Sequence, residues 1–293
     1  MVGGVRISHP DRVVYPDVGL TKYDVARYYE SVAQWILPHV KGRPLTLVHC
    51  PDGLNGSCHY LRHAKAWGPS ALRRVRIREQ KKIGEYLVAD SQEAVVSLAQ
   101  MGVLEVHTWN STTDHLEQPS RIIWDLDPGP QVEWSEVVRG ARLLRSVLDL
   151  LGLQTWVKTT GGAGLHVVLP IAPSREWSWC LEFSRAVAAS IERSEPDAFT
   201  TAFAKHGRED KILIDYLRNN RTNTSVAAFS TRARAGAPVS TPVSWEEIAR
   251  GRPSFTVATL RQRMARRRSD PWSGYWQCRQ RIAERSLRAV QRM

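Results

Sequence analysis

The sequence predicts a mixed α/β or α+β fold, with a mixed β-sheet and surrounding helices. Three observations support this class. The 293 residues are 42% hydrophobic and 24% charged, which is close to the average for a soluble globular protein. Strand-like runs and amphipathic helical runs follow one another along the whole chain. Their alternation is too irregular for a Rossmann array, and no internal repeat or low-complexity linker interrupts the sequence.

The first half of the chain contains two predicted helices. Thr21 is a suitable N-cap for a helix that runs to Pro38, because the apolar residues between them follow helical spacing. A second helix is expected over 91–102, with Ser91 as its cap and Gly102 as its stop. Strands are predicted in the other apolar runs, at 43–50, 57–63, 75–79, 84–90, 104–109 and 121–127.

The second half repeats this mixture. Amphipathic helices are expected over 134–152 and 175–194. Short helices broken at Pro253 and Pro271 follow from Trp245 onward. The predicted strands are 155–160, 165–170, 211–217 and 225–230, the first two of them joined by a glycine-rich turn at 161–164.

Simple counts exclude several classes of protein. No run reaches the roughly 18 apolar residues of a membrane-spanning helix, and the first residues lack the apolar region of a secretory signal. The four cysteines are too few and too irregularly spaced for a disulfide framework. We therefore expect a cytoplasmic protein with no membrane partner, in which Cys50 and Cys58 pack as small apolar residues.

The positive charge is concentrated near the C-terminus. The chain has a formal net charge of +12, and residues 250–293 hold twelve Arg, no Lys and two acids, so +10 of it lies in this segment. A basic surplus of this size indicates a polyanionic partner, most often nucleic acid. A solvated helical face is the alternative interpretation.

Three aspartates are candidate metal ligands. Asp125 and Asp127 share a face of an apolar strand, and Asp215 lies in a second apolar strand. Neighbouring carboxylates are costly unless a cation neutralises them, and their hard oxygens suit Mg²⁺ or Mn²⁺. Together they could hold two divalent ions for nucleotidyl transfer. Solvated carboxylates, or an ion pair of Asp215 with Arg218, are the alternative.

The segment 158–166 combines glycines with polar side chains but matches neither the P-loop nor the dinucleotide fingerprint. Its backbone N–H groups could approach an anion beside Thr160 and His166, and an ordinary hairpin turn is the alternative. Basic residues near Asp215 suit a triphosphate substrate. They are Lys205, Arg208, Lys211, Arg218, Arg221, Arg232 and Arg234, of which we select Arg208 and Lys211 as candidate nucleotide ligands. The spacing of His49, Cys50, Cys58, His59 and His63 matches no standard zinc site.

A set of motifs resembles one known family. The motifs are HPDRVVYPDVGLTK, GRPLTLVHCPDG, LEVHTWN, IIWDLDPG, TTGGAGLH, ILIDYLRNNR and AAFSTRARAGAPVSTPVSWEEI. In this order they resemble the polymerase domain of the bacterial end-joining DNA ligases, DNA ligase D, a branch of the archaeo-eukaryotic primase superfamily. The resemblance runs from residue 8 to residue 276 and implies a primase-like catalytic sheet with a second, flanking sheet and surrounding helices.

The resemblance also implies roles for individual residues. Asp125, Asp127 and Asp215 would hold Mn²⁺ or Mg²⁺ for template-directed addition of nucleotides, preferably ribonucleotides, to a primer 3′-hydroxyl at gaps and double-strand breaks. The nucleotide would be contacted by His107, Thr160, Gly161, His166 and Arg232. Arg12 and Lys22 would grip a DNA 5′-phosphate, and Tyr60 would stack near the templating base.

The resemblance further implies an organisation and a setting. Residues 1–293 would form a single domain, in which 1–60 contribute 5′-phosphate recognition and 245–293 form a basic helical segment. A Ku homodimer and an ATP-dependent ligase module would be its partners, in a bacterial cytoplasm at the nucleoid.

Three departures from the family's pattern stand out. Ala163 stands where many relatives carry Lys, His59 replaces a frequent aromatic residue, and His9 and Arg12 stand where some relatives carry Asn and Lys. A non-catalytic DNA-end-binding recruitment module, a de novo primase and a metal-dependent nuclease remain alternatives.

Overall fold

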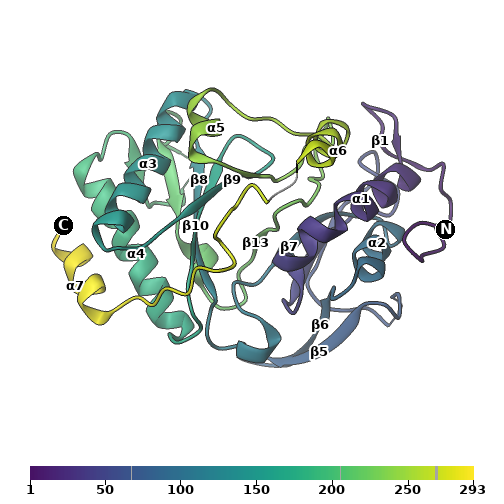
Figure 1. Ribbon diagram of the computed structural model, residues 1–293, viewed down its shortest axis with the longest axis horizontal. Helices are drawn as coiled ribbons and strands as arrows, with labels where there is room; N and C mark the ends of the chain where they lie inside the picture. Colours follow the sequence, from purple (N-terminus) through teal and green to yellow (C-terminus); the bar gives the residue numbers. More distant parts are fainter. Residues whose placement is uncertain (67, 205, 268–269) are drawn as a thin grey trace. The chain divides into compact units, whose positions relative to one another are not determined.

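The computed structural model describes residues 1–66, 68–204, 206–267 and 270–293, and the chain forms two compact units (Figure 1). Both units combine strands with helices, so the predicted mixed class is confirmed. Lys205, one of the basic candidates, lies outside the described residues. Unit 1 consists of Met1–Asp114, Val226–Thr241 and Ser254–Asp270, and unit 2 of His115–Ser225, Pro242–Pro253 and Pro271–Met293.

Unit 1 is built on a four-stranded sheet in which β3 runs antiparallel to both of its neighbours. The strand order is β13 (Ser225–Val226), β7 (Val103–Thr108), β3 (Leu45–His49) and β4 (His59–Leu61). Apolar residues of the sheet form one core with three helices, α1 (Lys22–Val40), α2 (Gln92–Gln100) and α6 (Val257–Arg266). Two hairpins complete the unit, β1 (Val13–Tyr15) with β2 (Leu20–Thr21), and β5 (Arg73–Arg78) with β6 (Ile83–Val88).

Helix α1 begins as predicted but ends later. Thr21 accepts a hydrogen bond from the Asp24 backbone N–H, and the Asp24 carboxylate accepts one from the Thr21 backbone, which forms a capping box. The helix passes Pro38 and ends at Val40. A proline in the last turn removes a single backbone hydrogen bond, and burial of Val40 in the core holds that turn in place.

Unit 2 contains a six-stranded sheet that is antiparallel except for β11 and β12. Its order is β11 (Phe199–Thr200), β12 (Ile212–Asp215), β8 (Arg121–Pro128), β10 (Leu165–Pro170), β9 (Trp156–Thr159) and β14 (Pro242–Val243). The helices of this unit are α3 (Trp134–Leu150), α4 (Trp177–Ser194), α5 (Trp245–Ala249) and α7 (Glu284–Arg292). The described residues also form 3-10 turns at Thr113–His115 and Leu217–Asn219.

The two faces of this sheet differ in character. Trp124 points toward α4, where its indole N–H donates to the Ser184 carbonyl over 2.9 Å. Because side chains alternate along a strand, Ile123 and Asp125 point to the opposite face. There Ile123 packs with Trp272 and Tyr275. The pleat of β8 thus separates its acidic residues from the helix-covered face.

Cys50 and Cys58 form a disulfide bond, so the prediction that they pack as free apolar residues is wrong. Cys50 directly follows β3, and Cys58 directly precedes β4. Pairing of these antiparallel strands makes His49 and His59 direct partners and brings the adjoining cysteines together. That pairing is a property of the fold, so cysteine spacing alone could not reveal it.

The other two cysteines, Cys180 and Cys278, are free. Burial raises the pKa of the Cys180 thiol to about 12. None of the helices formed by the described residues combines the length and hydropathy that crossing a membrane requires.

Candidate active site and DNA-binding residues

Four strands of unit 2 each place one polar residue at the same register position. Asp215 on β12 is the direct partner of Asp125 on β8. Asp125 is also the partner of His166 on β10, and His166 is the partner of Lys158 on β9. Directly opposite residues share a face of a sheet. Two carboxylates, an imidazole and an ammonium group therefore form a row across the sheet, which we call the polar row.

Arg218 joins the two carboxylates of the polar row. Its Nε lies 2.8 Å from Asp215 Oδ2 and 3.3 Å from Asp125 Oδ2. On the other side of Asp125, His166 Nε2 lies 3.4 Å from Oδ1. Asp127 is more exposed and pairs with Arg208, whose Nη2 lies 3.1 Å from Oδ2. The structure thus brings all three predicted aspartates close to positively charged groups of unit 2.

The two buried carboxylates have opposite electrostatic environments. Burial alone would raise the pKa of Asp125, but His166, Arg218 and Lys158 outweigh it and hold that pKa well below its ordinary range. Burial raises the pKa of Asp215, and the charges of Asp125 and Asp127 add to this effect, although Arg218 opposes it. Asp215 therefore gains the most from an additional cation.

His166 is buried and carries no charge near neutral pH. Burial and the charge of Lys158 lower its pKa to about 4, in spite of the attraction of Asp125. Its Nδ1 atom has no hydrogen-bond partner among the described residues. A buried ring nitrogen without a partner is costly, so this atom is available to a bound group.

The predicted glycine-rich turn between β9 and β10 is confirmed. The Thr160 hydroxyl donates to the Gly164 carbonyl over 3.1 Å and accepts from the Gly162 backbone N–H over 3.2 Å. Gly161 has a φ of +73°, a conformation that favours glycine. A Cβ on Gly164 would lie 2.0 Å from the Leu126 carbonyl oxygen. Contact of this turn with an anion stays a prediction.

The aspartates offer the right ligand chemistry for a hard divalent cation. Within the described residues, no group of three or more His, Cys, Asp or Glu side chains is already arranged around one metal position. Asp125 and Asp215 nevertheless direct one oxygen each to the same cationic group, the Arg218 guanidinium. Carboxylate oxygens that converge on one cationic group are suitable ligands for Mg²⁺ or Mn²⁺. The raised pKa of Asp215 shows that its negative charge lacks full compensation, which a metal ion would provide.

In unit 1, Glu105 connects two predicted nucleotide-binding residues. Its Oε1 lies 3.0 Å from Arg232 Nε, and its Oε2 lies 2.8 Å from His107 Nε2. Burial alone would raise the pKa of Glu105, but His107 and Arg232 lower it to about 2. We did not select Glu105 from the sequence. Its signal was an acid in an otherwise apolar strand, two residues before His107.

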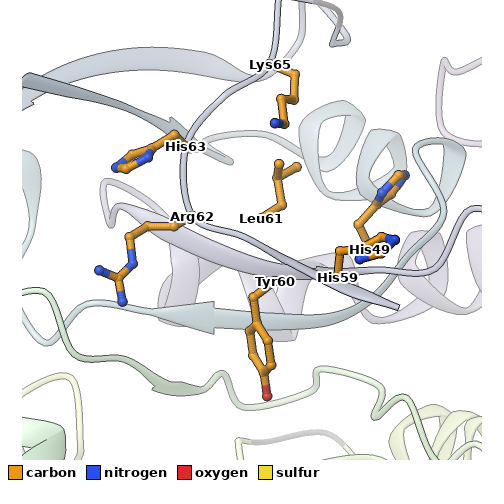
Figure 2. Close-up of a pocket in the computed structure, with 7 residues that line it drawn as sticks. All are labelled: His49, His59, Tyr60, Leu61, Arg62, His63 and Lys65. Carbon is orange, nitrogen blue, oxygen red and sulfur yellow. The ribbon is translucent and has the colours of Figure 1, made fainter. Parts of the chain in front are cut away.

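Tyr60 lies on β4 and is 77% exposed. Its ring centroid is 6.4 Å from that of His107, in an edge-on arrangement. Figure 2 shows Tyr60 pointing away from His49 and His59, as alternation along a strand requires. His59 therefore does not extend the exposed surface of Tyr60. The neighbouring cavity of about 340 Å³ is lined by His49, His59, Tyr60, Leu61, Arg62, His63 and Lys65.

Arg12 and Lys22 form a pair of adjacent cationic residues. The Lys22 backbone N–H donates to the Arg12 carbonyl over 2.8 Å. Lys22 is only 8% exposed, and burial together with the charge of Arg12 lowers its pKa. Two adjacent cations at a partly desolvated position favour binding of an anion such as phosphate.

The remaining basic residues of unit 2 differ in whether they contact an aspartate of the candidate metal site. Lys211 donates its ammonium group to the Pro196 carbonyl over 2.9 Å, whereas Arg208 reaches Asp127. Arg218 forms the ion pair with Asp215 that was the alternative interpretation of this acid in the sequence. Lys158 belongs to the polar row but was not among the candidates, because the register between strands that places it there is not visible in the sequence.

Comparison with known proteins agrees with this fold. Residues 21–272 match the family model described as "LigD, primase-polymerase domain". The chain is 35% identical over 292 residues to the "Multifunctional non-homologous end joining protein LigD" of Pseudomonas aeruginosa, covering 99% of this chain and 35% of that protein. A protein of the same name from Mycolicibacterium smegmatis is 33% identical over 247 residues, covering 84% of this chain and 32% of that protein.

A solved structure is similar along most of its length. The "Polymerase Domain from Mycobacterium tuberculosis Ligase D in complex with DNA" matches with a TM-score of 0.84 and 27% identity, covering 89% of this chain and 94% of that one. The fold and these matches thus define a domain of the primase-polymerase class.

The chain belongs to the LigD primase-polymerase domain family, which confirms the resemblance found in the sequence. It spans about a third of the length of the curated relatives it matches.

Proposed function

We propose that the protein is a template-directed nucleotidyltransferase that adds nucleotides to a primer 3′-hydroxyl at DNA gaps and double-strand breaks, in bacterial non-homologous end joining. The observation that carries this proposal is the polar row, in which Asp215 and Asp125 lie directly opposite each other on paired strands of a LigD-type sheet. The names of the relatives support the end-joining context, and the DNA-bound polymerase domain supports DNA as substrate.

Asp125, Asp127 and Asp215 would hold divalent metal, Mn²⁺ or Mg²⁺. When bound, the metal would activate the 3′-hydroxyl and neutralise charge on the triphosphate. Arg218 would leave the carboxylate oxygens that it contacts and so become available to a phosphate. His166 would hold Asp125 in orientation through Nε2.

Each unit contains residues to which the family resemblance assigns a role in nucleotide binding. In unit 2, backbone N–H groups of the turn at Gly161 and the side chains of Thr160, His166, Arg208 and Lys211 would contact the triphosphate. In unit 1, we assign His107 and Arg232, which Glu105 holds in place. Because Ala163 is neutral, these groups would have to neutralise more of the negative charge of the triphosphate.

The DNA would be held by unit 1. Arg12 and Lys22 would bind the 5′-phosphate at the far side of a gap, because a phosphate would compensate for the burial of Lys22 and for the charge of Arg12, which together lower the pKa of Lys22. Tyr60 would stack near the templating base, since its side chain is largely exposed and aromatic rings are surfaces on which nucleobases stack.

The wider setting is also a proposal. Residues 1–293 would act as one domain beside a Ku homodimer and an ATP-dependent ligase module, in the bacterial cytoplasm at the nucleoid. Residues 1–60 would contribute 5′-phosphate recognition, and 245–293 would contribute basic surface.

Primer extension tests the proposed activity. The substrate is a labelled, 5′-phosphorylated gapped duplex with Mn²⁺ and ribonucleotides. We expect addition directed by the template base, and none without a primer. Tight DNA binding without extension would instead indicate a recruitment module, and synthesis on an unprimed template would indicate a primase. Shortening of the labelled strand would indicate a nuclease.

A further inference from the structure

The disulfide bond between Cys50 and Cys58 closes a loop that contacts the predicted 5′-phosphate site. The loop comprises residues 51–57, which connect the paired strands β3 and β4. Cys50 is fully buried, whereas Cys58 is exposed. One sulfur is therefore fixed in the core, and the other is accessible to small molecules in solution.

This loop holds Arg12 in place. The Arg12 Nη1 group donates to the Pro51 carbonyl over 2.6 Å and lies 3.4 Å from Asp52 Oδ1. Pro51 is the residue next to the buried cysteine. Since Asp52 is well exposed, its ion pair is weak in water, and the Pro51 carbonyl is the stronger positioning contact.

The loop is also in close contact with β1. The Leu54 backbone N–H donates to the Val14 carbonyl over 3.0 Å. A Cβ on Gly53 would lie 2.7 Å from Val14 Cα, so glycine permits this close approach. The disulfide bond, the loop, β1 and Arg12 thus form one connected set, and Lys22 adjoins it through the Arg12 carbonyl.

We propose that the Cys50–Cys58 bond is a redox-controlled positioning element for Arg12, which strengthens recognition of a DNA 5′-phosphate when oxidised. The proposal rests on the proposed function of Arg12 and Lys22. Reduction gives the 51–57 loop more conformations, and the Pro51 carbonyl no longer has a fixed position. A disulfide in a cytosolic protein is usually of this transient, redox-sensing kind.

The redox step needs a low-molecular-weight disulfide as oxidant. The Cys58 thiolate attacks it to form a mixed disulfide and releases one small thiol. The Cys50 thiolate then displaces the second small thiol, so that two electrons and, by way of solvent, both cysteine protons pass from the protein to the two small thiols that are released. A small dithiol reverses both steps.

The test compares binding of two gapped duplexes that differ only in a downstream 5′-phosphate or 5′-hydroxyl. The quantity measured is the ratio of their dissociation constants, for protein oxidised with a small disulfide and for protein reduced with dithiothreitol. We expect the preference for phosphate to fall by roughly tenfold on reduction, the value of one well-placed contact to a charged group. Cys58→Ser should show the reduced value under both conditions.

Cys278→Ser is the matched control, since it removes a free cysteine and should keep the full redox response. Equal phosphate preference in the oxidised and reduced proteins, with the bond verified by mass spectrometry, would overturn the proposal, as would failure of the bond to form. If neither state prefers phosphate, the assignment of Arg12 and Lys22 is wrong instead. Extension of an open primer–template should not respond to reduction; an equal loss there would indicate a purely structural bond.

Discussion

Asp125 and Asp215 lie directly opposite each other, yet only Asp125 is held firmly in its charged form. Before a metal ion binds, the negative charge of Asp125 is already stabilised by its contacts with Arg218 and His166. The negative charge of Asp215 is unfavourable in its buried position, and a metal ion would stabilise it.

Replacing Asp125 tests its role with little change of shape. We expect Asp125→Asn to lower the rate of primer extension by roughly a thousandfold, because metal-assisted charge stabilisation is worth several kcal/mol. The measurement is single-turnover extension at saturating Mn²⁺. Asp149→Asn on α3, an exposed acid, is the control and should retain the native rate. A residual rate above one tenth for Asp125→Asn would remove Asp125 from the metal site.

Lys22 provides a second test at the scale of one side chain. Lys22→Gln should reduce the preference for a 5′-phosphate over a 5′-hydroxyl gap by about tenfold, because one charged partner of the phosphate is lost. Competition binding with the two duplexes measures this preference. Lys41→Gln, an exposed lysine after α1, is the control. Phosphate recognition lies elsewhere if both variants keep the native ratio.

His166 predicts a dependence of stability on pH. Its pKa is about 4 in the folded protein and 6.5 when unperturbed. The unfolded chain therefore binds a proton that the folded protein does not, and the free energy of unfolding should fall as pH drops from 6.5 to about 4. Asp215, with its raised pKa, acts in the opposite direction.

Urea unfolding between pH 4 and pH 7 measures this effect. His166→Gln keeps a donor for Asp125 but cannot titrate, so its free energy of unfolding should depend less on pH within this window. Glu105 contributes only below pH 4.5 and should leave the comparison unchanged. An identical pH dependence in the two proteins would contradict the buried, neutral state of His166.

Some of the site could be predicted from local sequence. Two acids spaced by two residues on an apolar strand must share a face, which is why Asp125 and Asp127 stood out. Lys158 and Glu105 could not be selected in this way. The position of Lys158 depends on strand pairing, and Glu105 contacts Arg232, which lies more than a hundred residues away in the chain. Residue spacing within one strand does not show which residues of another strand lie opposite it.

At the scale of elements, the hairpin of β9 and β10 depends on one glycine. Gly164→Ala would place a Cβ 2.0 Å from the Leu126 carbonyl, and that carbonyl belongs to the central strand β8. We expect the substitution to destabilise the protein by about 3 kcal/mol or more, since backbone must shift.

Thermal or urea unfolding measures this loss. Gly152→Ala is the control, because a Cβ there meets no atom within 4 Å and only its φ of +72° is unfavourable, at about 1 kcal/mol. If the two variants are equally stable, the close approach of the turn to β8 is incorrect.

Helices and strands were largely predictable because their signals are local. Caps at Thr21 and Ser91 accept the expected hydrogen bonds. The ends of helices could not be predicted where tertiary contacts determine them, as for α1, which continues past Pro38 to Val40. The predicted strand 225–230 is wrong beyond its first two residues, because only Ser225–Val226 form a strand. Further along the run, Phe229 has a positive φ, which is incompatible with an extended conformation.

At the scale of the whole molecule, the basic C-terminal segment is not one surface. Residues 254–270, with α6, belong to unit 1, whereas 271–293, with α7, belong to unit 2. On α7, Leu287 and Val290 are buried, and Arg285, Arg288 and Arg292 are exposed. Their spacing places these arginines along one side of the helix.

This stripe predicts a salt-dependent contribution to DNA binding. Changing Arg285, Arg288 and Arg292 to Gln should lower the slope of log affinity against log salt by up to about 2.7, at roughly 0.9 per phosphate contact. The slope is measured by fluorescence anisotropy with duplex DNA at salt concentrations from roughly 50 to 300 mM, a range over which counterion release changes the affinity strongly. Arg142→Gln with Arg145→Gln on α3 is the control; equal losses per charge would mean that no specific surface is involved.

The division of the chain into interleaved segments has a consequence for synthesis. The polypeptide passes between the two units five times, so the core of unit 1 still lacks Val257, Leu260 and Met264 of α6 when its first 114 residues are complete. At about 5–20 residues per second, the ribosome takes roughly 7 to 30 seconds more to deliver that helix. During this interval the nascent chain exposes apolar surface of α1, which makes it a natural client for chaperones that bind during translation.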